Sequence, residues 1–212
     1  MRALVLLLAP LFLLASCGPP PTGLGLQVYQ SYDLPAKPAT HPSKVVVKVS
    51  LARQRAYVME GSEVLLAMPV SVGTPQTPTP TGHFRIREKD ARHRSRTDGF
   101  ASRGGEIKRS QRRNTAPGWK FTGRPLPYWC AFTPTLGFHT GWIKHHPCSD
   151  GCIRMHENIA PKFFALVQVG TPVHIATTQP EDRDHAFIPL PPDSGPLPDH
   201  PNSYYLGDSA FR

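Results

Sequence analysis

Short stretches rich in apolar and β-branched residues mark the start of the ordered region and are typical of β-strands. The stretches cover residues 45–50, 55–59 and 64–70. Turn residues at 60–62 separate the second stretch from the third, so we predict that a hairpin or meander opens the domain. Residues 73–82 alternate Thr and Pro too densely for a ladder strand, and an extended pattern resumes over residues 84–87.

A helical spacing of apolar residues occurs near the end of the ordered region, within residues 158–169. The residues with this spacing are Ile159, Phe163, Leu166 and Val167. They predict one helix packed on a sheet. Gly170 ends this helix, and residues 171–176 are predicted to form the last strand. The fold class that follows is mostly β, mixed α/β, with one or two helices over residues 44–176.

The N-terminal residues predict export. Arg2 precedes an apolar run over residues 3–14 that is too short to span a bilayer comfortably. We therefore interpret residues 1–17 as a signal peptide. Its end, Leu-Ala-Ser-Cys, resembles the lipobox of bacterial lipoproteins, which implies a lipid anchor on Cys17. The alternative is an ordinary secretory signal with an incidental cysteine.

Prolines divide the remaining chain. The sequence has 25 of them, concentrated between Pro19 and Pro42 and between Pro180 and Pro201. Such segments favour extended chain over a packed core. We predict a Pro-rich tether over residues 18–43 and a Pro-rich C-terminal tail over residues 177–212, to which we assign no function.

Charge points to an anionic partner. The chain has 24 Lys and Arg against 15 Asp and Glu, a formal net charge of +9. Residues 88–120 carry much of the excess, and three interpretations stay open for them: a nucleic-acid arm, a solvated surface insertion, or cations that steer an acidic glycan-peptide polymer. Aromatic residues are sparse there and no nucleic-acid motif accompanies the run, so we predict no nucleic-acid partner.

Candidate chemistry lies between residues 137 and 155. A thiol is a weak nucleophile until a base removes its proton. Cys152 follows Gly151 directly, and His139 lies 13 positions upstream (152 − 139), far enough for a loop to return it beside the sulfur. A buried cysteine near a core histidine is the alternative that residue types alone leave open.

The run from Gly137 to Met155 resembles the active-site signature of the L,D-transpeptidase (YkuD-type) catalytic domain. In that family a histidine in an H-x-G segment is the general base, and the cysteine of a Ser-His-Gly-Cys-Ile/Val-Arg segment is the nucleophile. These residues map onto His139 and Cys152, and Arg154 matches the arginine that follows. Residues 69–86 and 167–175 also agree with the family.

This resemblance implies a β-sandwich-type catalytic domain that transfers an acyl group from a peptidoglycan stem peptide to an amine, without a cofactor. The alternatives are an L,D-carboxypeptidase or amidase trimming the same substrate, and a noncatalytic peptidoglycan-binding lipoprotein. Backbone N–H groups near Gly151 and Cys152 are the expected oxyanion donors. The further expected substrate-binding or oxyanion residues are Ser149, Asp150, Arg154, Thr140, Tyr128 and Trp129. For Tyr128 and Trp129 core packing is an equal alternative, as a structural salt bridge is for Arg154.

Asp150 departs from the family pattern, which has histidine at this position. Side chains two apart in an extended segment point to the same side, so Asp150 and Cys152 should face a shared space. A carboxylate there would raise the pKa of the Cys152 thiol and that of His139. Alternatively, Asp150 points into solvent and is screened.

The remaining cysteines and histidines leave two structural alternatives. With Cys17 lipidated and Cys152 free, Cys130 and Cys148 remain as a possible disulfide pair. Zinc is a rival to cysteine catalysis, because six candidate ligands crowd together: His139, His145, His146, Cys148, Cys152 and His156. Their spacing lacks the second ligand couple of a structural zinc module, so we predict no metal.

Overall fold

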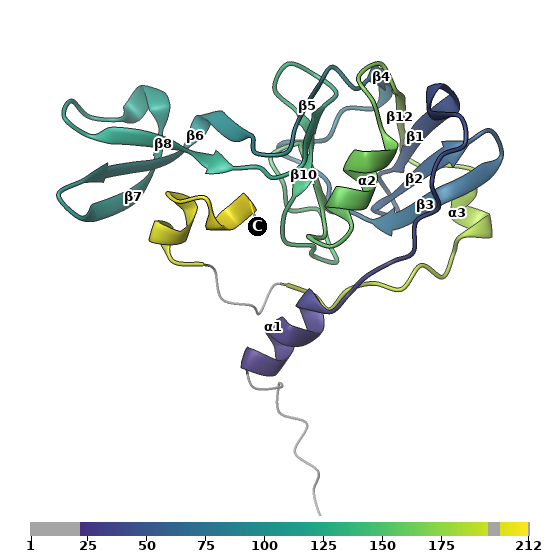
Figure 1. Ribbon diagram of the computed structural model, residues 1–212, viewed down its shortest axis with the longest axis horizontal. Coiled ribbons are helices and arrows are strands. Elements are labelled where there is room, and N and C mark those ends of the chain that lie inside the picture. The colour runs from purple at the N-terminus through teal and green to yellow at the C-terminus, as the bar shows by residue number, and fades with distance from the viewer. Residues whose placement is uncertain (1–21, 195–199, 212) are drawn as a thin grey trace, which may run out of the picture.

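A computed structural model of the protein describes residues 22–194 and 200–211 (Figure 1). The described part is mostly β with three α-helices, which confirms the predicted fold class. The predicted signal peptide and Cys17 lie outside the described residues. No helix of the described residues is long and apolar enough to cross a membrane.

The first sheet has the order β3-β2-β1-β12-β4. Its strands are β1 (Val45–Ser50), β2 (Arg55–Glu60), β3 (Glu63–Pro69), β4 (Gly82–Arg85) and β12 (Pro172–Ala176). Strands β1, β2 and β3 are successive antiparallel neighbours, and β12 lies parallel to β1. The predicted opening meander and last strand are therefore confirmed. Their β-branched residues suit a pleated surface that is covered by other side chains.

The second sheet has the order β11-β10-β9-β5. Its strands are β5 (Glu88–Asp90), β9 (Trp129–Ala131), β10 (Gly137–Thr140) and β11 (Ile153–Met155). Helix α2 (Ala160–Leu166) confirms the predicted helix and buries Phe163, whose ring centroid lies 4.7 Å from that of Phe138 on β10. The core between the sheets and α2 thus fixes the inward face of β10.

A third sheet, which we call the arm, projects from the rest of the molecule (Figure 1). It has the order β7-β6-β8 and consists of β6 (Arg94–Arg103), β7 (Glu106–Gln111) and β8 (Lys120–Pro125). Gly99 and Gly123 permit close backbone contact, because a Cβ on either would lie 2.1 Å from a carbonyl oxygen of the facing strand. The sequence did not predict these strands. Polar residues occupy both faces of most of the arm, so apolar and polar residues do not alternate along its strands.

Both ends of the described chain pack on the body, unlike the extended ends that we expected. Helix α1 (Thr22–Gln30) lies within the predicted tether, and Tyr29 and Leu34 are 2% and 8% exposed. Helix α3 (Glu181–Asp184) lies within the predicted tail, where buried Asp182 accepts hydrogen bonds from Ser50 and Tyr57. Residues 200–211, the C-terminal segment, form two 3₁₀ turns beside the arm (Figure 1).

Candidate active site

The pairing of β10 with β11 positions His139 beside Arg154, two residues after Cys152. The strands are parallel, with Phe138 opposite Ile153 and His139 opposite Arg154. Phe138 and Ile153 are fully buried in the core, so His139 and Arg154 point to the other face. Cys152 lies two residues before Arg154, and the backbone N–H of Gly137 lies within hydrogen-bonding reach of its sulfur. Gly137 in turn lies two residues before His139.

His139 is set up to accept a proton. Its ring is 8% exposed, and Nδ1 lies 2.7 Å from the carbonyl oxygen of Thr140. A carbonyl only accepts, so we assign the ring proton to Nδ1, which leaves a lone pair on Nε2. Burial lowers the pKa of His139 to about 4; the Thr140 carbonyl opposes this shift, and the positive charge of Arg154 adds to it. The expectation that Asp150 raises the pKa of His139 is wrong, because burial dominates.

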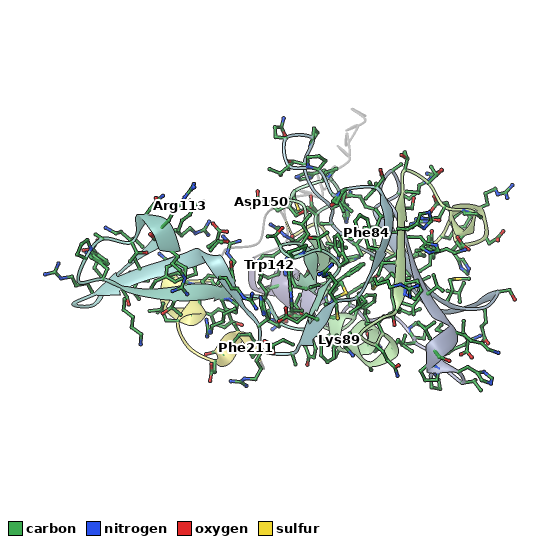
Figure 2. All side chains as sticks on the ribbon, turned by 90° about the horizontal axis from the view of Figure 1, so that it is seen from above. Phe84, Lys89, Arg113, Trp142, Asp150 and Phe211 are labelled. Carbon is green, nitrogen blue, oxygen red and sulfur yellow. The ribbon has the colours of Figure 1, made fainter. Side chains whose placement is uncertain are left out.

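The Cys152 thiol lies in a partly buried position that favours its neutral form. Burial raises its pKa, while the Gly137 N–H and the Arg154 guanidinium lower it. The Asp150 carboxylate also raises the pKa of the thiol, in the direction that we expected. It is the smallest of these causes, and the Asp150 side chain is exposed (Figure 2). The resting pair is therefore a neutral thiol and a neutral imidazole.

The loop before Cys152 is held by two buried hydroxyl groups. Ser149 Oγ donates to the Cys152 carbonyl at 2.5 Å and accepts the Gly151 N–H at 3.2 Å. Thr79 Oγ1 donates to the Gly151 carbonyl and accepts the Gly73 N–H, both at 2.9 Å. Gly151 has φ +99°, a conformation that other residues rarely adopt.

These bonds change two expected roles. The hydroxyl of Ser149 donates and accepts within the loop, so it holds the loop in position. The Gly151 N–H is also used, which leaves the Cys152 N–H as the loop's candidate oxyanion donor.

A cavity of about 390 Å³ adjoins this face, and we call it the His139 cavity. It lies where the arm meets the body, with Trp142 beside it and Phe211 on the C-terminal segment (Figure 2). Its lining includes His139, Thr140, Arg154 and Tyr128. Cys152 is not among the lining residues, so the cavity adjoins the histidine side of the pair.

The two predicted aromatic wall residues have different positions. Tyr128 borders the His139 cavity and has φ +56°, which is strained for a residue with a side chain. Trp129 is 5% exposed and stacks on His93, with ring centroids 4.8 Å apart. The expectation of a substrate-facing Trp129 is therefore wrong, and core packing is its role.

Comparison with known families identifies the domain. Residues 44–175, more than half of the chain, match the L,D-transpeptidase catalytic domain family, YkuD. The chain belongs to this family. A comparison with functionally curated proteins returned no match.

Solved structures of L,D-transpeptidases are also similar to the chain. A Mycobacterium smegmatis enzyme is 22% identical with a TM-score of 0.48, covering 63% of this chain and 58% of its own. A Stackebrandtia nassauensis enzyme is 21% identical with a TM-score of 0.48, covering 74% and 66%. L,D-transpeptidase 1 of Mycobacterium tuberculosis is 24% identical with a TM-score of 0.44, covering 63% and 61%. The chain thus spans about three fifths to two thirds of the length of these proteins.

In this L,D-transpeptidase-family domain, Arg154 faces the His139 cavity. Its Nη1 lies 3.6 Å from the Cys148 sulfur, and its stem covers Gly141, where a Cβ would lie 3.0 Å from Arg154 Cδ. Arg154 makes no ion pair with any residue in the described ranges. The salt-bridge alternative therefore has no support, and the guanidinium remains available to a ligand.

The possible disulfide is absent: Cys130 and Cys148 are both free thiols, as is Cys152. Cys130 lies fully buried in β9, where burial raises the pKa of its thiol to about 12, whereas Cys148 lines the His139 cavity. Positions on different sides of one strand layer explain why they do not pair.

Two of the candidate zinc ligands, His145 and His156, are engaged by backbone carbonyls. His145 Nε2 lies 2.8 Å from the Pro191 carbonyl oxygen, and His156 Nε2 lies 2.9 Å from that of Tyr29. In the part of the chain that the structure describes, no group of three or more His, Cys, Asp or Glu side chains could hold a metal ion.

Two residues that shape the site, Thr79 and Tyr29, were not predicted from the sequence. Thr79 braces Gly151, and its place in a Thr-Pro run before Gly82 was the available signal. The Tyr29 hydroxyl accepts the Ile143 N–H at 2.9 Å, and its ring packs at a tilt of 58° against Trp142, with centroids 5.0 Å apart. Nothing in the local sequence connects Tyr29 to a site more than 100 residues away, because only folding brings them together.

Proposed function

We propose that the protein is a peptidoglycan L,D-transpeptidase with Cys152 as nucleophile and His139 as general base. The observation that carries this proposal is the β10–β11 register. In this register His139, whose Nδ1 lies 2.7 Å from the Thr140 carbonyl oxygen, is opposite Arg154, two residues after the partly buried Cys152. Side chains two apart in an extended segment point to the same side, which favours a Cys152 thiol on the side of His139. Family membership supports the reaction class.

Acylation begins when His139 Nε2 takes the Cys152 proton while the sulfur attacks the carbonyl carbon of an L,D peptide bond. Negative charge then develops on the carbonyl oxygen, where the Cys152 N–H can donate a hydrogen bond. Collapse of this intermediate breaks the peptide bond, and His139 returns the proton to the departing amine of the D-residue. A thioester on Cys152 results.

Deacylation repeats these steps with a new nucleophile. An amine of a second stem peptide attacks the thioester, His139 takes the amine proton, and the thiol leaves with that proton. Attack by water would instead release a shortened stem, so the same site would then act as an L,D-carboxypeptidase. Because both catalytic groups are neutral at rest, charge appears only in the course of attack.

The proposed location in the cell rests on the substrate and on residues 1–17. Peptidoglycan lies outside the cytoplasmic membrane, so the enzyme must be exported and act in the cell envelope. The lipobox-like end of residues 1–17 supports a lipid anchor on Cys17. The basic residues of the arm favour approach of an acidic glycan-peptide polymer.

Mass spectrometry of defined muropeptides incubated with the purified protein tests the activity. Cross-linked product is expected from the native protein, and a product shortened by one residue would indicate the carboxypeptidase. Cys152→Ala should abolish both. His139→Ala should lower the rate about 10²–10⁴-fold. The matched control is His83→Ala, since His83 lies on β4 in the other sheet.

Acylation by a carbapenem gives a second readout, because the family's nucleophiles react with these compounds. Peptide mapping should place the adduct on Cys152, with Cys130 and Cys148 as internal controls. Full transfer activity in either catalytic variant, or an adduct only on another cysteine, contradicts the assignment.

A further inference from the structure

The His139 cavity has walls that lie outside the matched domain. The family match covers residues 44–175, but Tyr29 before it and the C-terminal segment after it also line the cavity. The lining residues of the C-terminal segment are His200, Tyr204, Tyr205, Ala210 and Phe211. Residues outside the matched domain therefore complete the walls of this cavity.

The C-terminal segment is fastened to the base of the arm. Arg94 donates to the carbonyl oxygens of Tyr205 at 2.9 Å and Gly207 at 2.7 Å, and Arg92 pairs with Asp208 at 2.7 Å. The Tyr205 ring stacks on Phe100 with centroids 5.1 Å apart and an interplanar angle of 6°. Charge-assisted hydrogen bonds to these two carbonyls give the segment a defined position.

Aromatic rings continue this attachment across the cavity. His200 stacks between Trp142 and Tyr204, with centroids 5.9 Å and 4.1 Å apart. Trp142 belongs to the loop that follows His139, so the segment lies against the catalytic strand's own continuation. A cavity of about 390 Å³ remains beneath it. That volume falls within the range of roughly 300–1,000 Å³ for ligand sites, so the segment is a wall and not a plug.

Several cationic side chains face this cavity. Arg124, Lys144 and Arg154 line it, and none forms an ion pair within the described ranges. Among the described residues that line the cavity, Glu157 is the one with a carboxylate. Burial raises the pKa of Glu157, which weakens its compensation of the cations. Unpaired guanidinium groups at a concave surface favour a carboxylate ligand, because they can donate two parallel hydrogen bonds to it.

We propose that the His139 cavity binds the carboxylate-bearing end of a peptide, and that the C-terminal segment is a specificity-determining wall of this site. Arg124 holds the carboxylate, and the rings of His200 and Tyr204 contact the peptide. As a substrate site of the enzyme, the cavity rests on the proposed transpeptidase function.

Calorimetric binding to Cys152→Ala protein separates this proposal from the chemistry. The probes are a tetrapeptide stem with a free C-terminal carboxylate and the same peptide as its C-terminal amide. The acid should bind more tightly than the amide. Arg124→Gln should abolish that difference by weakening only the acid, about tenfold or more, as expected for a charge-assisted hydrogen bond.

Ring variants test the wall. Tyr204→Ala should raise the Kd of the acid roughly 2–12-fold, the range for one aromatic contact. Tyr204→Phe should keep native affinity, because stacking needs the ring and not the hydroxyl. Ser203→Ala, in the same turn, is the matched control. Thermal melting of each variant verifies that the fold is retained.

The outcomes distinguish the two proposals. Equal binding of acid and amide, or an unchanged Kd in both Arg124→Gln and Tyr204→Ala, would overturn the cavity proposal even if native protein cross-links stems. Tighter binding in Tyr204→Ala would also overturn it, since the segment would then be an inhibitory cover. If the free-acid peptide binds more tightly than the amide but the native protein catalyses no acyl transfer, the cavity proposal is supported and the proposed function is refuted.

Discussion

Ser149→Ala tests whether one hydroxyl group holds the nucleophile loop. Ser149 is 2% exposed, and its Oγ bonds both the Cys152 carbonyl and the Gly151 N–H. Removing it leaves two backbone groups without their partner, and each buried unsatisfied group costs about 1–3 kcal/mol. We therefore expect the free energy of unfolding to fall by about 2–6 kcal/mol. The Tm should fall by roughly 2–4 °C for each kcal/mol.

The same change should reduce activity beyond its effect on stability. The Cys152 carbonyl would no longer be tied to the turn, so the sulfur would sample positions away from His139. Misplacement by about 1 Å can cost up to ~100-fold in rate. Turnover measured well below the Tm of the variant should therefore fall while the fold is intact.

Urea denaturation and turnover together check this reasoning. The control is Ser110→Ala in β7, whose hydroxyl donates to the Gln111 carbonyl at the molecular surface and should matter by less than about 0.5 kcal/mol. Thr79→Val removes the second brace on Gly151, and a double-mutant cycle with Ser149→Ala should show coupling of about 0.5–3 kcal/mol. A loss below about 0.5 kcal/mol with unchanged turnover would refute the role of Ser149.

Three further predictions concern other parts of the molecule. Because Asp150 raises the pKa of the Cys152 thiol and Arg154 lowers it, the pH midpoint of alkylation should move down in Asp150→Asn and up in Arg154→Gln; opposite shifts would mean that the local field is misassigned. Gly137→Ala should destabilise the domain strongly in denaturant titration, since its Cβ would lie 2.8 Å from the Trp129 ring. Cys17→Ala should release the protein from the membrane fraction, and persistent membrane association would count against a lipid anchor.

Local sequence predicted the elements whose residues signal them directly. The apolar runs over residues 45–50, 55–59 and 64–70 correspond to the strands of the opening meander, and the spacing over 158–169 corresponds to α2. Burial on one or both faces imposes such patterns, so they can be read without the fold. The strands of the arm were not predicted, because most of their side chains face solvent and therefore need no alternation of apolar and polar residues.

By itself the sequence determined the type of chemistry: a Gly-Cys pair, an upstream H-x-G segment and the motifs of one catalytic family. It could not determine which neighbouring side chains share that site. Tyr29 and the C-terminal segment reach the cavity from opposite ends of the chain, and long-range packing alone brings them there. It also could not give the protonation of His139 and Cys152, because burial is the largest cause of both pKa shifts, and burial exists only in the folded protein.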